Sequence, residues 1–65
     1  MRITDYDKVC YLTEQRDELI PLRNLKTGKI GYSLGCTLEG ETIQVKLESG
    51  ELDSWSRDEC DEIPH

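Results

Sequence analysis

The sequence predicts a small all-β domain organised around a three-stranded antiparallel meander over residues 29–39, 42–48 and 51–55. The first observation is an unbroken alternation of apolar and other residues from Lys29 to Glu39, which resumes after Gly40-Glu41. The second is the Gly40-Glu41 dipeptide itself, which suits a two-residue type II′ hairpin because glycine accepts a positive φ. The apolar positions of the two alternating stretches are Ile30, Tyr32, Leu34, Cys36 and Leu38, and then Ile43, Val45 and Leu47.

The hairpin also predicts a register for the first two strands. A shift of one residue would turn every apolar side chain outward, so we expect the pairing that keeps them on one face. Gly31 and Gly35 lie inside the first strand, where glycine permits a bulge or a sharp bend. The expected pairs are Leu38 with Ile43, Cys36 with Val45, and Leu34 with Leu47.

The turn between the second and third strands has two interpretations. A two-residue loop at Ser49-Gly50 would bury Leu52, whereas a three-residue loop that includes Glu48 would pair Ile43 with Trp55 and bury Trp55. A bulge near 53–54 would bury both residues, and we favour that arrangement.

The flanking segments predict shorter elements. Residues 8–13 are β-prone and form a short strand in this interpretation, followed by a charged loop. Pro21 removes a backbone donor, so we expect residues 19–25 to form an extended edge segment or a loop rather than a central strand. Ser56 and Glu59 match a capping box, which predicts a one-turn helix at 56–59 before a short closing strand at 60–63.

This order of elements resembles the five-stranded SH3-like small β-barrel, and in outline it is similar to Tudor and KOW-type modules. The resemblance is carried by Lys29–Leu38, Thr42–Gly50 and Ser56–Ile63. It implies a five-stranded antiparallel barrel and, through Tudor modules, a cage for a cationic side chain. A four-stranded sheet or a barrel of the Sm or OB type is the alternative. Proteins of this superfold have many different functions, so function is argued from the residues below.

The net charge and the cysteines indicate which partners and which cellular compartment to expect. The net charge is −6, which disfavours nonspecific binding to nucleic acid or to an anionic membrane. No apolar run is long enough to cross a bilayer, and we expect a single domain over residues 1–65 in the cytoplasm. The three cysteines, Cys10, Cys36 and Cys60, are unevenly spaced and odd in number, which favours free thiols in a reducing compartment.

Catalysis, metal binding and cofactor binding find little support in the residues. The one histidine, His65, is terminal, and no nucleophile elbow or phosphate-binding loop occurs. The cysteines lack the close pairs of structural zinc sites, and acids around Cys60 should raise its pKa. We therefore expect no enzyme, no metal and no cofactor. The aromatic residues that an exposed cage would need are Tyr6, Tyr11, Tyr32 and Trp55, for which core packing is the preferred interpretation.

The function that remains is a non-catalytic protein-binding or regulatory module with an acidic face. Trp55 would be its anchor if the indole is exposed, and self-association through a sheet edge is also open. The acidic rim is expected to consist of Asp53, Asp58, Glu59, Asp61 and Glu62. The alternative is a nucleic-acid-binding barrel whose basic loop carries Arg23, Lys26 and Lys29.

Overall fold

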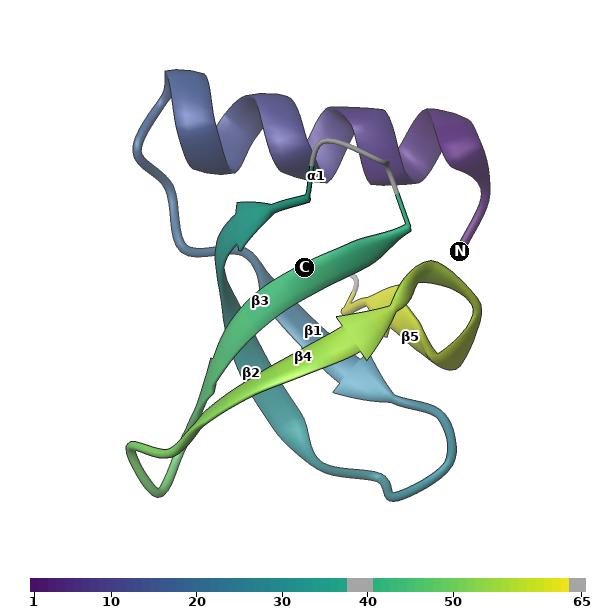
Figure 1. Ribbon diagram of the computed structural model, residues 1–65, viewed down its shortest axis with the longest axis vertical. Helices are drawn as coiled ribbons and strands as arrows, with labels where there is room; N and C mark the ends of the chain where they lie inside the picture. Colours follow the sequence, from purple (N-terminus) through teal and green to yellow (C-terminus); the bar gives the residue numbers. More distant parts are fainter. Residues whose placement is uncertain (38–40, 64–65) are drawn as a thin grey trace.

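A computed structural model describes residues 1–37 and 41–63 of the chain (Figure 1). It contains one α-helix, a five-stranded antiparallel sheet and one turn of 3₁₀-helix. The strand order is β4-β3-β2-β1-β5. The elements are α1 (Ile3–Gln15), β1 (Pro21–Asn24), β2 (Ile30–Cys36), β3 (Thr42–Leu47), β4 (Leu52–Ser56), η1 (Arg57–Glu59) and β5 (Cys60–Glu62).

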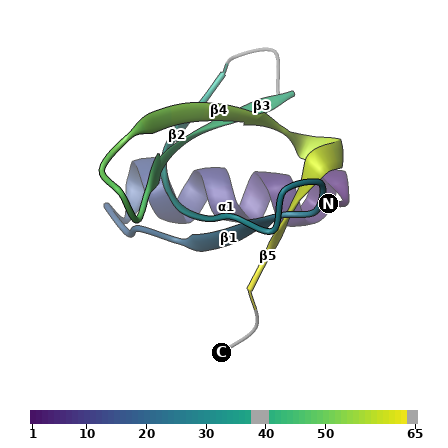
Figure 2. The same ribbon diagram turned by 90° about the horizontal axis from the view of Figure 1, so that it is seen from below.

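The sheet coils strongly, so that β4 and β1 lie on opposite sides of the core (Figure 2). The predicted antiparallel sheet of five strands is confirmed, but the described strands do not close into a barrel. β4 and β5 remain the two edges of the sheet and are joined in sequence by η1. The core contains Val9 from the helix, Leu22, Ile43, Val45 and Trp55 from the sheet, and Cys60.

The predicted strand at residues 8–13 is wrong, because this segment lies within α1. Its buried residues, Tyr6, Val9 and Thr13, are three and four positions apart, which places them on one face of a helix. Tyr6 also donates a hydrogen bond from its hydroxyl to the Thr42 carbonyl oxygen, 2.8 Å away. In this segment, packing of one helical face against the sheet therefore outweighs the β-propensity of the individual residues.

The predicted register between β2 and β3 is also wrong. Cys36 lies opposite Ile43 and Ser33 lies opposite Val45, with a bulge between Ser33 and Gly35. The bulge reverses the expected face: Ser33 is fully buried, whereas Leu34 is 43% exposed. Residues 38–40 lie outside the described part, so the hairpin predicted at Gly40-Glu41 lies partly there as well. The glycines of this strand permit a bulge or a sharp bend, and the bulge is present, but the alternating pattern does not predict the resulting shift in register.

The β3–β4 connection has the three-residue form. Ile43 pairs with Trp55 and Lys46 pairs with Leu52, without the bulge predicted at 53–54. Gly50 has a φ of 96°, and its amide donates to the Leu47 carbonyl oxygen over 2.9 Å. Trp55 is therefore buried, at 3% exposure, whereas Leu52 is 73% exposed.

The segment around Pro21 is more central than predicted. Pro21 begins β1, which pairs with β2 on one side and with β5 on the other. The first residue of a strand tolerates proline, since the missing donor is not needed there. The C-terminal prediction is confirmed: Ser56 and Glu59 form the capping box of η1, and β5 follows it directly.

Candidate functional site

A groove lies between the end of the β1–β2 loop and the β3–β4 loop, and we call it the loop groove. It has a volume of about 500 Å³. The residues that line it are Gly28, Lys29, Ile30, Leu47, Glu48, Ser49 and Glu51.

Each wall of the loop groove adjoins a turn that local hydrogen bonds hold in place. In the β1–β2 loop, Asn24 Oδ1 accepts hydrogen bonds from the amides of Lys26 and Thr27, at 2.9 and 3.0 Å. Gly28 completes this turn with a φ of 75°, which favours glycine. In the opposite wall, the Leu47 amide donates to the Glu51 carbonyl oxygen over 2.8 Å. The pairing of Gly31 with Leu47 in the sheet brings residues 28–30 next to residues 47–51, which line the groove.

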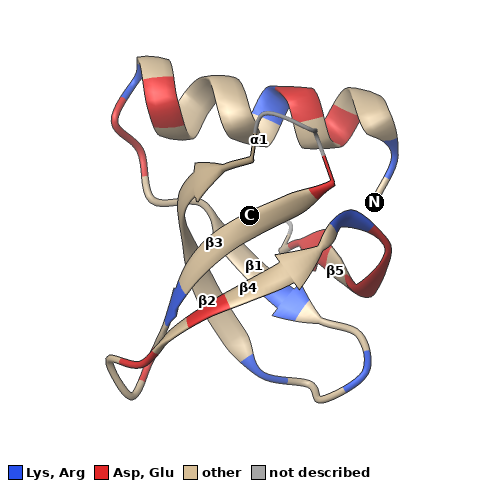
Figure 3. Cartoon of the chain, viewed as in Figure 1, with Lys and Arg blue, Asp and Glu red and all other residues tan. Residues whose placement is uncertain are grey.

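The chemistry of the loop groove is apolar at its base and acidic at its rim. Ile30 and Leu47 supply aliphatic side chains that are half-buried and buried. Glu48 and Glu51 are exposed, and Lys29 is the one cationic residue among those that line the groove. Figure 3 shows the acidic residues of the β3–β4 loop and the basic residues of the β1–β2 loop at the same end of the molecule. The groove therefore offers apolar contact together with an excess of negative charge.

The structure divides the predicted acidic rim among three elements. Asp53 lies on β4, Asp58 and Glu59 lie on η1, and Asp61 and Glu62 lie on β5.

Several of these carboxylates already have partners within the chain. Asp53 accepts hydrogen bonds from the Ser54 amide at 2.8 Å and from Trp55 Nε1 at 3.0 Å. Glu59 accepts from the Ser56 amide, and Glu62 lies 3.1 Å from the Lys8 ammonium. Much of the predicted acidic rim thus stabilises the fold.

Trp55 does not provide the exposed anchor that we expected. Its ring is buried in the core, and its indole N–H is bonded to Asp53. Tyr6 is buried as well, whereas Tyr11 is 54% exposed on the helix. Core packing is thus confirmed for two of the four aromatic residues, and these two cannot contribute to an exposed cage.

The three predicted basic residues are exposed, but each of them lies near acids. Arg23 is the cross-strand partner of Asp61. The Lys26 ammonium lies 3.9 Å from a Glu59 carboxylate oxygen. Lys29 lines the loop groove with Glu48 and Glu51. These acids reduce the positive potential that a phosphate backbone would meet.

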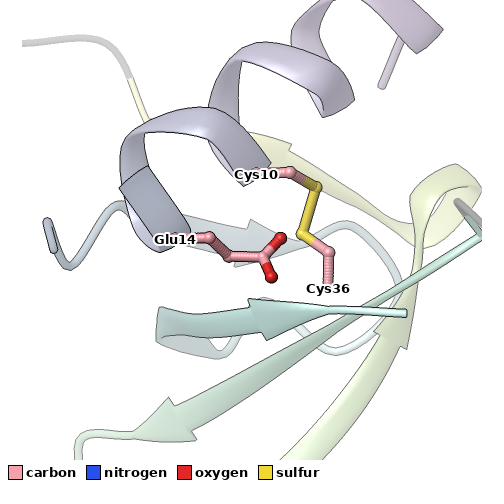
Figure 4. Close-up of side chains that lie close together, drawn as sticks. All are labelled: Cys10, Glu14 and Cys36. Atoms are coloured by element: carbon pink, nitrogen blue, oxygen red, sulfur yellow. A yellow bond between two sulfur atoms is a disulfide. The ribbon is translucent and has the colours of Figure 1, made fainter. Parts of the chain in front are cut away.

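The cysteines are not all free, contrary to the prediction. Cys10 of α1 and Cys36 of β2 form a disulfide with a Cα–Cα distance of 5.9 Å (Figure 4). The predicted strand at 8–13 hid this pair, because in a helix Cys10 faces the end of β2. Glu14, one turn further along α1, points its carboxylate toward the disulfide (Figure 4). A helical interpretation of residues 3–15 would have revealed the Cys10–Glu14 pair from its spacing of four.

Cys60 is a free thiol, as predicted, and it is fully buried. Burial raises the pKa of Cys60 to about 11. The amino group of Met1 lowers this pKa, while Glu59 and Asp61 raise it. The expected direction is confirmed, although desolvation rather than the neighbouring acids is its largest cause. A thiol of this kind is a poor nucleophile at neutral pH.

Comparisons with known proteins found no matching family model, no matching curated protein and no matching solved structure. Of the helices in the described part of the chain, none has the length and apolar character needed to span a membrane.

Proposed function

We propose that this protein is a non-catalytic module that binds a basic segment of another protein in the loop groove. The observation that carries this proposal is the combination of Ile30 and Leu47 with the exposed carboxylates of Glu48 and Glu51 in one hollow. Lysine and arginine side chains have an apolar stem and a cationic head, which match these two features. The net charge of −6 attracts such a segment from a distance.

This proposal keeps the expected acidic face but moves its centre. Trp55 and Asp53 are bonded to each other, and Glu59 and Glu62 are engaged within the chain. Glu48 and Glu51 belong to no ion pair among the residues that the structure describes, so their charges are available to a partner. Binding to an exposed, charged groove of this size is expected to be weak and sensitive to salt.

The test is the affinity of a labelled short peptide of alternating lysine and leucine, measured by fluorescence anisotropy at low salt. The double variant Glu48→Lys/Glu51→Lys is expected to weaken binding about tenfold, since it replaces two attractions by repulsions. The matched control, Asp7→Lys/Glu18→Lys, alters two exposed acids outside the groove and changes the net charge equally, from −6 to −2. It is expected to weaken binding about twofold or less, through the long-range field alone.

Two results would contradict the proposal. Equal weakening by the two double variants would show that net charge alone attracts the peptide. A loss confined to Asp58→Lys/Asp61→Lys would instead place binding on η1 and β5. Tight binding of an oligonucleotide that is lost in Lys26→Glu would support the nucleic-acid alternative.

A further inference from the structure

The Cys10–Cys36 disulfide and Glu14 form a cluster that the loop groove does not involve. One ligand atom from each of the three residues lies within 4.8 Å of the others. Cys10 and Glu14 are four residues apart on α1, so they share one face of the helix, and Cys36 approaches from the end of β2. Figure 4 shows the three side chains converging between these elements.

We propose that the reduced form of this cluster is a binding site for one soft divalent metal ion of the zinc type. Two thiolates and one carboxylate are ligands that zinc accepts, and a water molecule would complete a tetrahedral set. Tetrahedral zinc with Zn–S distances of about 2.3 Å separates two sulfurs by about 3.8 Å. The Cα–Cα distance of 5.9 Å between Cys10 and Cys36 allows this separation with only small side-chain rotations.

The position of Glu14 is the second observation that points to a cation. Its carboxylate is directed at the two sulfurs although the residue is exposed to solvent. Within residues 1–37 and 41–63, no lysine or arginine forms an ion pair with it. In the reduced protein a carboxylate beside two thiolates concentrates negative charge, and a dication neutralises that charge.

The two states of the cluster interconvert by thiol–disulfide exchange. A small thiol attacks one sulfur of the Cys10–Cys36 bond, and a second thiol molecule releases the mixed disulfide. The small molecule leaves as its own disulfide, and the protein keeps two thiols. Each thiol then loses one proton as its sulfur binds the metal ion. In the reverse direction, a small-molecule disulfide oxidises the two thiolates, takes up two protons to become two thiols, and frees the ion.

Cys60 is excluded from the site by its position. It is fully buried at the start of β5, and its thiol donates to the Ser56 carbonyl oxygen over 3.4 Å. It therefore provides an internal thiol control.

In the experiment, the protein is reduced, and the reductant is removed under anaerobic conditions. The reduced protein is then titrated with Co²⁺, and Zn²⁺ is added afterwards as a competitor. We expect one equivalent of Co²⁺ to produce the near-ultraviolet absorption of cobalt–thiolate bonds, and Zn²⁺ to remove it. Cys10→Ser and Cys36→Ser should abolish this absorption, whereas Cys60→Ser should leave it unchanged. The oxidised protein should show none.

Glu14 is tested by a matched pair of carboxylate variants. Glu14→Gln should weaken metal binding about tenfold or more, whereas Glu18→Gln, an exposed acid outside the cluster, should not. Glu14→His restores a ligand at the same position and should recover the affinity. Equal affinities in Glu14→Gln and in the parent protein would overturn the role of Glu14.

Reduction of the disulfide could unfold the helix that carries Cys10 and Glu14, so the folding of the reduced protein is measured as well. Far-ultraviolet circular dichroism of the reduced protein is recorded with and without Zn²⁺. If helical signal is lost on reduction, the ion should restore it and raise the thermal midpoint, because the folded form brings all three ligands together and binds the ion more tightly than the unfolded chain does. A reduced protein that gives no thiolate absorption and no metal-dependent stabilisation would overturn the proposal.

Discussion

The indole ring of Trp55 occupies the place where a side chain on Gly31 would stand. A Cβ atom on Gly31 would lie 2.9 Å from Cη2 of Trp55 and 3.1 Å from Cβ of Val45. β2 and β4 are not neighbours in the sheet, so this contact crosses the core between them. The close approach of ring and backbone explains why glycine stands at this position.

Gly31→Ala is therefore expected to destabilise the fold by about 1–3 kcal/mol, since the added methyl group would press on two buried side chains, Trp55 and Val45. The measurement is the free energy of unfolding in urea. Gly35→Ala is the matched control on the same strand, because a Cβ there meets nothing within 4 Å. Its effect should stay within about 0.5 kcal/mol. Equal losses in the two variants would show that strand glycines matter only for backbone freedom.

The buried hydroxyls of Thr13 and Ser33 predict a measurable coupling between α1 and β2. Their oxygens are 2.6 Å apart, and Ser33 Oγ also accepts a hydrogen bond from the Ile20 amide over 2.9 Å. Ser33→Ala leaves the Thr13 hydroxyl and the Ile20 amide without their hydrogen-bond partner. It should lower the free energy of unfolding by about 1–3 kcal/mol. In a double-mutant cycle with Thr13→Val, a coupling energy of at least about 0.5 kcal/mol is expected. Additive losses would contradict the hydrogen bond.

Reduction of Cys10–Cys36 should lower stability by about 3 kcal/mol in the absence of metal. The bond joins residues 26 apart in sequence, and a loop of that length restricts the unfolded chain by roughly this amount. The urea midpoint, measured with and without reductant, is the test. The double variant Cys10→Ser/Cys36→Ser should no longer respond to reductant, and a response there would point to another cause.

Cys60 predicts a loss of stability at alkaline pH. Its pKa is about 11 in the folded protein, against 9.0 as the ordinary value. Between these values the unfolded chain loses the thiol proton while the folded protein keeps it, so stability falls as the pH rises. The loss should reach about 3 kcal/mol above pH 11 and be negligible below about pH 8. Unfolding curves of Cys60→Ala at the same pH values measure the contribution of all other titrating groups. The same pH dependence of stability in this variant and in the parent protein would contradict the prediction.

Local chemistry explains which elements could be predicted from the sequence. The capping box of η1 depends on Ser56 and Glu59 alone, and the β3–β4 turn depends on Gly50. Each of these features is encoded within a few neighbouring residues. The turn left two interpretations open, and the pairing of Ile43 with Trp55 decides between them.

Long-range contacts explain the predictions that are wrong. The register of β2 depends on the bulge at Leu34, which lets Gly31 lie against Trp55 and lets Ser33 reach Thr13. None of these contacts can be predicted from the alternation of apolar and polar residues. The helix is not predicted for a related reason. The residues around Val9 and Tyr11 have high β-propensity, and the helical face that they belong to is stabilised only by its packing against the sheet.

The candidate sites follow the same division. Glu48 and Glu51 stand out in the sequence as acids, but only the pairing of Gly31 with Leu47 brings them to Ile30 and Lys29. The expected anchor at Trp55 required an exposed ring, and the three-residue turn places that ring in the core.

The most direct measurement of the proposed function is a nitrogen–proton correlation spectrum of the oxidised protein, titrated at low salt with the lysine–leucine peptide. We expect the amide shifts to be confined to residues 28–30 and 47–51 and to vanish at high salt. A glutamate–leucine peptide of the same length should produce none. Shifts that fall on β5 and η1 instead, or shifts of the same size with both peptides, would contradict a basic partner in the loop groove.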